Sequence, residues 1–440
     1  MQTDRSKGLY ERALRSITAG LNSNTRARAP HPLYFSRADG PHVWDVDGNR
    51  YVDLAMGNGA IMLGHNNPAI REAVTAALAT GITTGSESET SVRAAELFLR
   101  LVPSAERVRF ANTGSEAMLH VLHMARTLTG RQAIAKVEGA YHGWFDSVYV
   151  STWPPLTEAG PDDAPIALPG TLGLVKNSMN DAVILPFNDV AATERLIRAR
   201  GKDLAAIIVE PSLIDVGFIP AEREYLLTLR RLADETGAVL VFDELLTGFR
   251  LARGGAQESY KIRADLAIYG KALGNGFPVA AVAGQQKFME ISTPGPGKTA
   301  FVGTFNGHAV ILAAVEASLK QLADGKATAQ LQTRTTTLIK EFQTLARRHG
   351  VPAQMQGGGG HIHWYFTPEP VRNYRQAARA NRERYAAFIT VLADAGFLVW
   401  SNYLQHHAIS LAHGDDEVKQ LVAAMDEGLE AAARVTVRPI

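Results

Sequence analysis

The sequence predicts an α/β protein with a mainly parallel central sheet covered by helices, and a smaller α+β domain formed by the C-terminus and an N-terminal arm. Two observations predict this fold. Through the middle of the chain, short apolar runs alternate with amphipathic stretches, an order typical of strand–helix–strand units. These runs are apolar without alternation, as expected of strands buried on both faces of a parallel sheet.

The elements of the sheet are expected within a large domain at residues 58–315. In chain order we predict a strand at 108–110, a helix at 115–128, and strands at 133–137, 205–209, 238–242, 266–269 and 280–283. A second helix lies between the strands at 205–209 and 238–242, because its apolar residues share one face. These residues are Tyr225, Leu226, Leu229, Leu232 and Ala233.

The regions on either side of the large domain have different sequence patterns. Residues 1–57 are expected to form an arm with a small hairpin around Asp47-Gly48. Residues 316–440 become largely helical and are expected to form the smaller domain. Residues 151–188 contain several Pro and Gly residues without periodicity. A loop of that length in a compact domain is usually a lid or a binding loop.

Composition excludes several classes of function. Lys plus Arg number 45 and Asp plus Glu number 44 among 440 residues, a formal net charge of +1. General attraction to nucleic acid or to an anionic membrane is therefore not expected. The chain has no cysteine, which excludes disulfides, thiolate zinc sites and cysteine nucleophiles. We expect a cytoplasmic protein, since no secretory signal or apolar run of roughly 20 residues is present.

The first chemical motif runs from Phe110 to Ala117, with the sequence Phe-Ala-Asn-Thr-Gly-Ser-Glu-Ala. A strand enters a turn of small residues and then a helix. The amides of Gly114 and Ser115 would be unpaired at the helix start, where the helix dipole favours an anion. Taken alone, the motif is better explained by a plain helix cap with a glycine turn.

The second motif, Val-Leu-Val-Phe-Asp-Glu, ends in Asp243 and Glu244. It places carboxylates at the carboxyl end of a buried strand, which is where open α/β sheets bind ligands. A carboxylate in that position needs a cationic partner or hydrogen bonds. The structural alternatives are that Asp243 caps the next turn or pairs with an arginine such as Arg250.

The third motif contains Lys271, which stands between Gly270 and apolar residues at the end of another strand. Lysine is rarely buried without a purpose, and desolvation makes it a usable amine nucleophile and base. A surface lysine with a buried stem is the alternative. Together, a phosphate cradle, an acid and an amine on adjacent strand ends are the parts of a pyridoxal phosphate (PLP) site. Tyr141, followed by His142, supplies an aromatic ring that can stack on the cofactor.

With these motifs in place, the sequence resembles the class III aminotransferases, which have fold type I of the PLP enzymes. It looks closest to their glutamate-1-semialdehyde aminomutase-like branch. The resemblance covers nearly the whole chain. The matching stretches are Asn22-Ser23, Leu63–His65, Asn112–Ala117, Glu138–Gly143, Val209–Pro211, Asp243–Arg250, Gly254–Gln257, Gly270-Lys271, Gly303–Asn306 and Ser410–His413.

The resemblance implies a role for each matching residue around PLP. Lys271 is the Schiff-base lysine and Asp243 contacts the pyridine nitrogen. Tyr141 and Leu245 cover the two faces of the ring. The remaining cofactor positions are Gly114 and Ser115 at the phosphate, His142, Glu210 as a carboxylate near the cofactor, and Thr304 reaching the phosphate of a partner subunit. For Glu210 a strand-end cap is an equal alternative, and Thr304 implies a homodimer with shared active sites.

Substrate residues follow less directly from the resemblance. Arg26 has the spacing of a carboxylate-binding arginine, although a solvated arginine of the arm explains it nearly as well. Asp215 stands where many class III transaminases carry a glutamate that pairs with a mobile arginine, and no such arginine is evident at 400–407. Asn58 departs from the tryptophan common in the aminomutases. Trp144 lines the pocket or simply packs.

The histidines are not expected to bind metal. His142, His363, His406 and His407 have no carboxylate at ligand spacing, so neutral, hydrogen-bonded imidazoles are the better interpretation. The function that the sequence favours is an aminotransferase acting between an amino acid or amine donor and a keto acid. An intramolecular aminomutase is the second hypothesis, and a PLP-binding protein without activity is the third.

Overall fold

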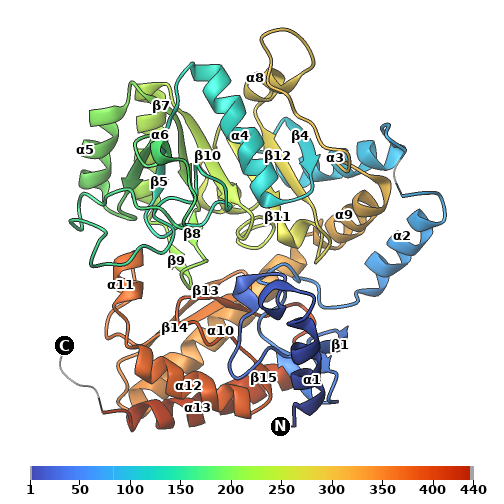
Figure 1. The fold of residues 1–440 in the computed structure, drawn as a ribbon, viewed down its shortest axis with the longest axis vertical. Coiled ribbons are helices and arrows are strands. Elements are labelled where there is room, and N and C mark those ends of the chain that lie inside the picture. Colours follow the sequence, from blue (N-terminus) through green and yellow to red (C-terminus); the bar gives the residue numbers. More distant parts are fainter. Residues whose placement is uncertain (1, 83, 437–440) are drawn as a thin grey trace.

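A seven-stranded sheet forms the centre of the protein (Figure 1), in a computed structural model that describes residues 2–82 and 84–436. The strand order is β4-β12-β11-β10-β7-β5-β6. In that order the strands are Arg107–Ala111, Ala280–Gly284, Leu266–Gly270, Val239–Glu244, Leu204–Val209, Ala133–Val137 and Ala182–Leu185. Only β12 pairs antiparallel with its neighbours in this sheet. The predicted mainly parallel α/β sheet is confirmed.

Helices cover both faces of this sheet. This explains why apolar and polar residues do not alternate along its strands. Val239 and Val241 of β10 pack in one cluster with the helix α4 (Gly114–Thr129). Leu240 and Phe242 face the other way, into the cluster that contains the helix α6 (Arg223–Thr236). The other helices of this part are α2 (Pro68–Leu78), α3 (Glu89–Leu101), α5 (Val190–Arg200), α7 (Ala256–Tyr260), α8 (Gln286–Met289) and α9 (Ala309–Leu322).

The segment at 151–188 is irregular except near its end. The expectation that it lacks regular structure was wrong for Ala182–Leu185, which forms β6 and pairs with β5 at the edge of the sheet. Four consecutive apolar residues are enough for an edge strand, and they were hidden by the Pro- and Gly-rich residues before them. A short hairpin of β8 (Ser212–Leu213) and β9 (Ile219–Pro220) follows β7.

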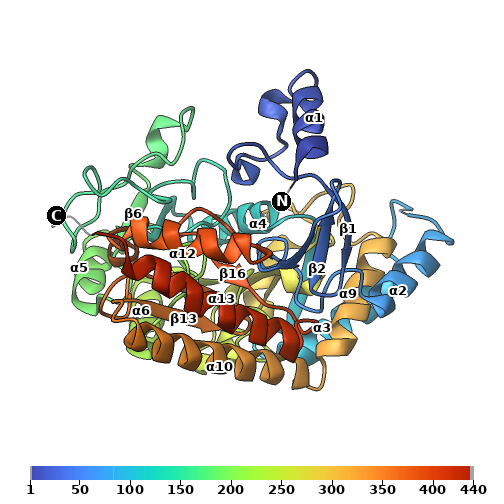
Figure 2. The same cartoon turned by 90° about the horizontal axis from the view of Figure 1, so that it is seen from below.

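The N-terminal and C-terminal parts of the chain lie together below the central sheet of Figure 1, and Figure 2 shows them from that side. In the N-terminal part, β1 (Phe35–Asp39), β2 (His42–Asp45) and β3 (Arg50–Asp53) form a small sheet, which β15 (Phe397–Leu398) joins from the C-terminal part. The hairpin expected at Asp47-Gly48 is the β2–β3 turn, where Gly48 has a φ of +94°.

The C-terminal part also contains a second small sheet and several helices. Its strands are β13 (Gln354–Gly358), β14 (His361–Tyr365) and β16 (His407–Ala408). Its helices are α10 (Lys326–Arg348), α11 (Tyr374–Ala378), α12 (Arg382–Asp394) and α13 (Asp415–Ala433), and α1 (Asp4–Ala13) belongs to the arm.

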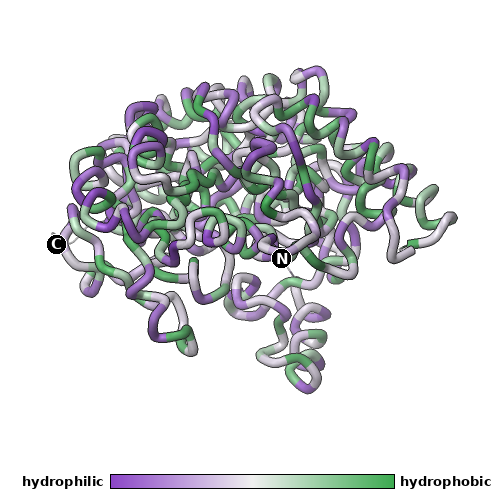
Figure 3. The backbone as a smooth tube through the Cα atoms, turned by 90° about the horizontal axis from the view of Figure 1, so that it is seen from above, coloured by the Kyte–Doolittle hydropathy of each residue, from purple (hydrophilic) through white to green (hydrophobic). Residues whose placement is uncertain are grey.

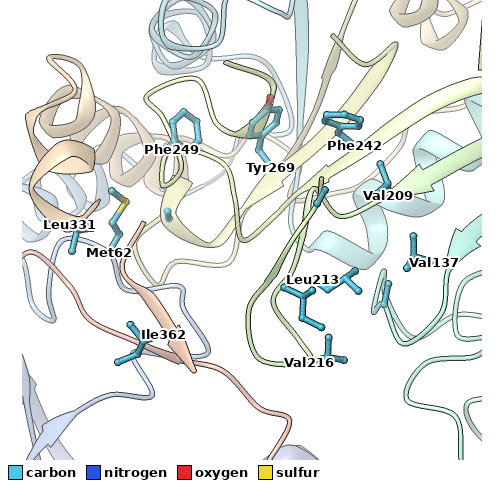
Figure 4. Close-up of a cluster of buried hydrophobic side chains, with 14 of the residues drawn as sticks. Met62, Val137, Val209, Leu213, Val216, Phe242, Phe249, Tyr269, Leu331 and Ile362 are labelled. Carbon is cyan, nitrogen blue, oxygen red and sulfur yellow. The ribbon is translucent and has the colours of Figure 1, made fainter. Parts of the chain in front are cut away.

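A shared core joins these parts. Figure 4 shows Val209, Phe242 and Tyr269 from the central strands above Leu331 and Ile362 of the C-terminal region. Along the outer helices, hydrophobic and hydrophilic residues alternate, as expected of helices with one buried face (Figure 3). No helix within 2–82 or 84–436 has the length and apolarity needed to cross a bilayer.

Candidate active site

Asp243 lies near the end of β10 and contacts His142, which follows β5. The carboxylate oxygen Oδ2 accepts a hydrogen bond from Nδ1 of His142 at 2.8 Å, and both side chains are buried. The other oxygen accepts from the backbone N–H of Leu245 at 3.1 Å. Asp243 therefore caps the turn after the strand, one of the two alternatives considered. The other does not hold, since Arg250 donates to backbone carbonyls instead.

The start of α4 faces the same region. Thr113 caps the helix in a capping box with Glu116, so Gly114 and Ser115 form its first turn. A Cβ atom on Gly114 would lie 2.5 Å from Cδ1 of Leu245, and one on Gly270 would lie 2.6 Å from its Cδ2. Leu245 thus closely approaches both glycines, and the fold places its side chain between the helix start and the end of β11.

Lys271 follows β11 in a left-handed conformation with a φ of +47°. Such backbone strain in a residue with a side chain is concentrated at functional sites. The charge of Lys271 acts on two buried carboxyl groups. Burial raises the pKa of Glu210 well above its usual value, as do Asp215 and Asp243, and Lys271 opposes the rise. Burial also raises the pKa of Asp215, again against the effect of Lys271.

Tyr141 precedes His142 and lies beside a second aromatic ring. Burial raises the pKa of its phenol to about 12. The ring of Trp153 is parallel to it, with an interplanar angle of 2° and centroids 5.8 Å apart. The indole N–H of Trp153 donates to the backbone carbonyl of Asp215 at 3.1 Å. Sequence reasoning missed Trp153, because no motif surrounds it and the contact spans the irregular segment at 151–188.

Thr304 lies on an exposed segment that is attached to the turn before α4. Asn112 donates to the side-chain oxygen of Asn306 at 2.9 Å. The neighbours of Thr304 include Val302 and Phe305, whose side chains are 73% and 58% exposed. Thr304 itself is exposed and does not meet the other predicted cofactor residues within the described chain.

The predicted substrate residues are only partly brought together. The side-chain oxygen of Asn58 accepts from the amide of Gln405 at 3.1 Å. The carboxylate of Asp215 lies 3.8 Å from Nδ1 of His406. Trp144 is 72% exposed, and Arg26 is exposed at the end of a short 3₁₀ turn. None of the hydrogen bonds or ion pairs among the described residues joins Arg26 to the site.

The other predicted histidines are buried. His363 bonds to the carbonyl of Tyr403 at 2.9 Å, and His407 accepts from the N–H of Trp400 at 3.0 Å. Burial lowers the pKa of His363 to about 4, so its imidazole is neutral at pH 7. Neither ring nitrogen of His406 has a hydrogen-bond partner among the described residues. Within 2–82 and 84–436, no three metal-ligating side chains gather as a metal site would require.

These residues fit PLP. Asp243 is a buried acid with a defined histidine partner, and Lys271 is an amine on the neighbouring strand end. The first turn of α4 leaves amides for a phosphate, and Leu245 packs closely against Gly114 in this turn. One carboxylate oxygen of Glu210 is buried without a partner among the described residues, so a polar group can still be received there.

Comparisons with known proteins agree with this fit. A statistical model of the Aminotransferase class-III family matches residues 23–425. The glutamate-1-semialdehyde 2,1-aminomutase of Persephonella marina is 34% identical over 96% of this chain and 97% of its own. An omega-transaminase from Sphaerobacter thermophilus has the same fold with a TM-score of 0.93, at 34% identity over 97% of both chains.

A transaminase solved with PLP bound is also similar, with a TM-score of 0.89 at 27% identity over 98% of this chain and 99% of that one. The family match over residues 23–425 and the near-complete alignments agree with the resemblance found in the sequence. The chain therefore belongs to the class-III aminotransferases, and it is an enzyme that depends on pyridoxal phosphate.

Proposed function

We propose that the enzyme moves an amino group from an amino acid, including a β- or ω-amino acid, or from a simple amine, to a keto acid such as pyruvate or 2-oxoglutarate. The observation that carries this proposal is the pair formed by Asn58 and Gln405. We assign this pair of amide side chains to the wall of the substrate site, at a position where the resemblance to aminomutases implies a large aromatic residue. A wider and more polar site favours release of the carbonyl product and entry of a second substrate.

Different residues of the site bind different parts of the cofactor. PLP, when bound, supplies an electrophilic carbon and a sink for the electron pair released at the substrate carbon. The amides of Gly114 and Ser115 would hold the phosphate, and Tyr141 and Leu245 would lie against the ring. Asp243, oriented by His142, would hold a proton at the ring nitrogen. Lys271 would provide the covalent attachment, and its amine would be free once an amine substrate has taken its place.

Lys271 also moves the proton. Its free amine would act as a general base for the proton on the substrate carbon, and then as a general acid that returns this proton to the electrophilic carbon of the cofactor. Glu210 and Asp215 lie within the electrostatic reach of this amine. Burial raises the pKa of both carboxyl groups, and the charge of Lys271 opposes the rise.

A donor panel tests this function. Purified enzyme is mixed with single amino donors, and the change in cofactor absorbance is followed in the absence of any keto acid. We expect a half-reaction with at least one donor, and recovery of the starting spectrum after pyruvate or 2-oxoglutarate is added. Lys271→Ala should lose far more than the roughly 10²–10⁴-fold that one acid–base group contributes. Spectra that no donor changes would contradict the proposal, and would favour the PLP-binding protein without activity.

The second candidate is an aminomutase of the glutamate-1-semialdehyde type. It is supported by the name of the Persephonella relative, which is as similar in sequence as the omega-transaminase. A mutase retains one molecule through both halves of the reaction, so it needs no separate donor and acceptor. Efficient conversion of glutamate 1-semialdehyde alone, without turnover of any donor and acceptor pair, would select this alternative.

We also propose a homodimer with shared active sites. The exposed side chains of Val302 and Phe305 flank Thr304, and Asn306 ties the same segment to the turn before α4. A second copy of the chain that covers these apolar side chains would bring Thr304 to the cofactor phosphate of its partner. Arg26, exposed in the arm, is the proposed contact for a substrate carboxylate.

A further inference from the structure

Lys136 is a buried lysine that the proposed chemistry does not use. It lies within β5, and its side chain is fully buried. Its Nζ donates to the carbonyls of Ala140 at 2.9 Å and Val150 at 2.5 Å, and lies 3.4 Å from the hydroxyl of Thr152. A buried amine that has three acceptors ties the chain segments carrying them together, because breaking the contacts would leave buried polar groups unpaired.

Two of these acceptors lie immediately before the two parallel aromatic rings. Ala140 precedes Tyr141, and Thr152 precedes Trp153. The hydroxyl of Thr152 also donates to the carbonyl of Ala140 at 3.3 Å. Lys136 therefore connects the backbone carbonyl of the residue before one ring to the side-chain hydroxyl of the residue before the other.

The backbone that carries Trp153 is strained and held on both sides. Ser151 and Trp153 have φ values of +47° and +51°, in the left-handed region that favours glycine. Such conformations persist only where the surroundings determine them. After the tryptophan, the carbonyl of Pro154 accepts from the hydroxyl of Tyr374 at 2.7 Å. A side chain that is 37% exposed is thus held in a defined place without being part of the core.

We propose that Trp153 and Tyr141 form a binding subsite for a flat apolar or aromatic substituent of the amino substrate, and that Lys136 is the positioning residue of this subsite. The proposal rests on the aminotransferase function and adds a substrate class to it. The indole extends the aromatic surface of Tyr141, and its N–H is already used by the carbonyl of Asp215. The exposed part of Trp153, 37% of the residue, remains for stacking on a ligand, which aromatic rings prefer in offset or edge-to-face geometry.

Binding of a matched pair of unreactive ligands tests the subsite. Calorimetry on the PLP-loaded enzyme measures the dissociation constants of butanoate and 3-phenylpropanoate, which differ by the phenyl group. Their ratio cancels the contribution of the shared carboxylate. We expect the wild type to prefer 3-phenylpropanoate, and Trp153→Ala to reduce that preference about tenfold while Trp153→Phe keeps most of it. Leu172→Ala, at a 97% exposed position in the same irregular segment, is the control and should change nothing.

Lys136→Met tests the positioning role. It should lower the same preference in the same direction, with the dissociation constant of butanoate nearly unchanged. Should this variant fail to fold, Thr152→Val removes one of the contacts at lower structural cost and carries the same expectation. An equal preference in the wild type and Trp153→Ala would overturn the subsite. The binding assay needs no turnover. If amino transfer fails, the proposed function is rejected, and the ratio of dissociation constants still tests the subsite at Trp153.

Discussion

Nδ1 of His142 lies 2.8 Å from Oδ2 of Asp243, although the two residues are 101 positions apart in the chain. Both side chains are buried, and the second oxygen of Asp243 is used by the N–H of Leu245. The carboxylate is therefore fixed in orientation from two directions.

The pair predicts a graded loss of activity. Asp243→Asn removes the charge that holds a proton at the cofactor ring, and we expect kcat to fall by about 10²–10³-fold. His142→Phe leaves the acid but removes its orienting partner, so a smaller loss is expected. Steady-state kinetics with saturating PLP measure both, and Asp163→Asn on the exposed surface is the control. A His142→Phe variant as impaired as Asp243→Asn would show that the histidine does more than orient.

The proposed role of Arg26 predicts a selective effect on substrates. Arg26→Ala should raise KM for carboxylated donors more than for simple amines, because it removes a charge-assisted contact worth about 1.5–3 kcal/mol. The comparison of KM across the two donor classes is the measurement. Arg12→Ala, at an exposed position of α1, should leave both classes unaffected. An equal rise for amines and amino acids would remove Arg26 from the substrate site.

The exposed segment around Thr304 predicts an obligate dimer. Light scattering should give twice the mass of the chain, and PLP should strengthen the assembly because it binds the assembled state. Phe305→Asp places a charge on the proposed interface and should shift the enzyme toward monomers with weaker PLP binding. The control is Leu227→Asp, which charges an exposed apolar position on α6. A PLP-saturated, active monomer would rule the dimer out.

Acid should destabilise the fold through its buried histidines. Burial lowers the pKa of His363 to about 4 from the usual 6.5 of a histidine, so the unfolded chain takes up a proton first as the pH falls. Stability from this group is complete above pH 6.5 and is lost as the pH falls toward 4, by up to about 3 kcal/mol. Urea unfolding of the wild type and His363→Gln between pH 7.5 and 4 measures it. The two free energies of unfolding should converge on acidification, and a constant gap would contradict the argument.

The sequence predicted those parts of the fold and site that depend on neighbouring residues. The apolar runs before Asp243 and Lys271 predicted two strands, and the structure places them side by side with their carboxyl ends together. The turn at Gly114 could be interpreted in the same way, because a strand, a small-residue turn and a helix are adjacent in the chain.

What the sequence could not predict depends on contacts between distant segments. The His142–Asp243 bond joins the segments after β5 and at β10, and the alternative partner Arg250 is directed to the carbonyls of Gly59 and Gly359. Trp153 reaches Tyr141 only because the irregular segment folds back over β5. No periodicity or motif spacing carries that information.

The central claim is transfer of an amino group between two separate molecules, and initial-rate kinetics test it most directly. Rates are measured while an active amino donor from the panel and its keto acid acceptor are varied together, and glutamate 1-semialdehyde alone is supplied in a parallel assay. We predict parallel lines in double-reciprocal plots, because the donor product leaves before the acceptor binds. Efficient formation of 5-aminolevulinate from glutamate 1-semialdehyde, with no turnover of any donor and acceptor pair, would contradict the claim.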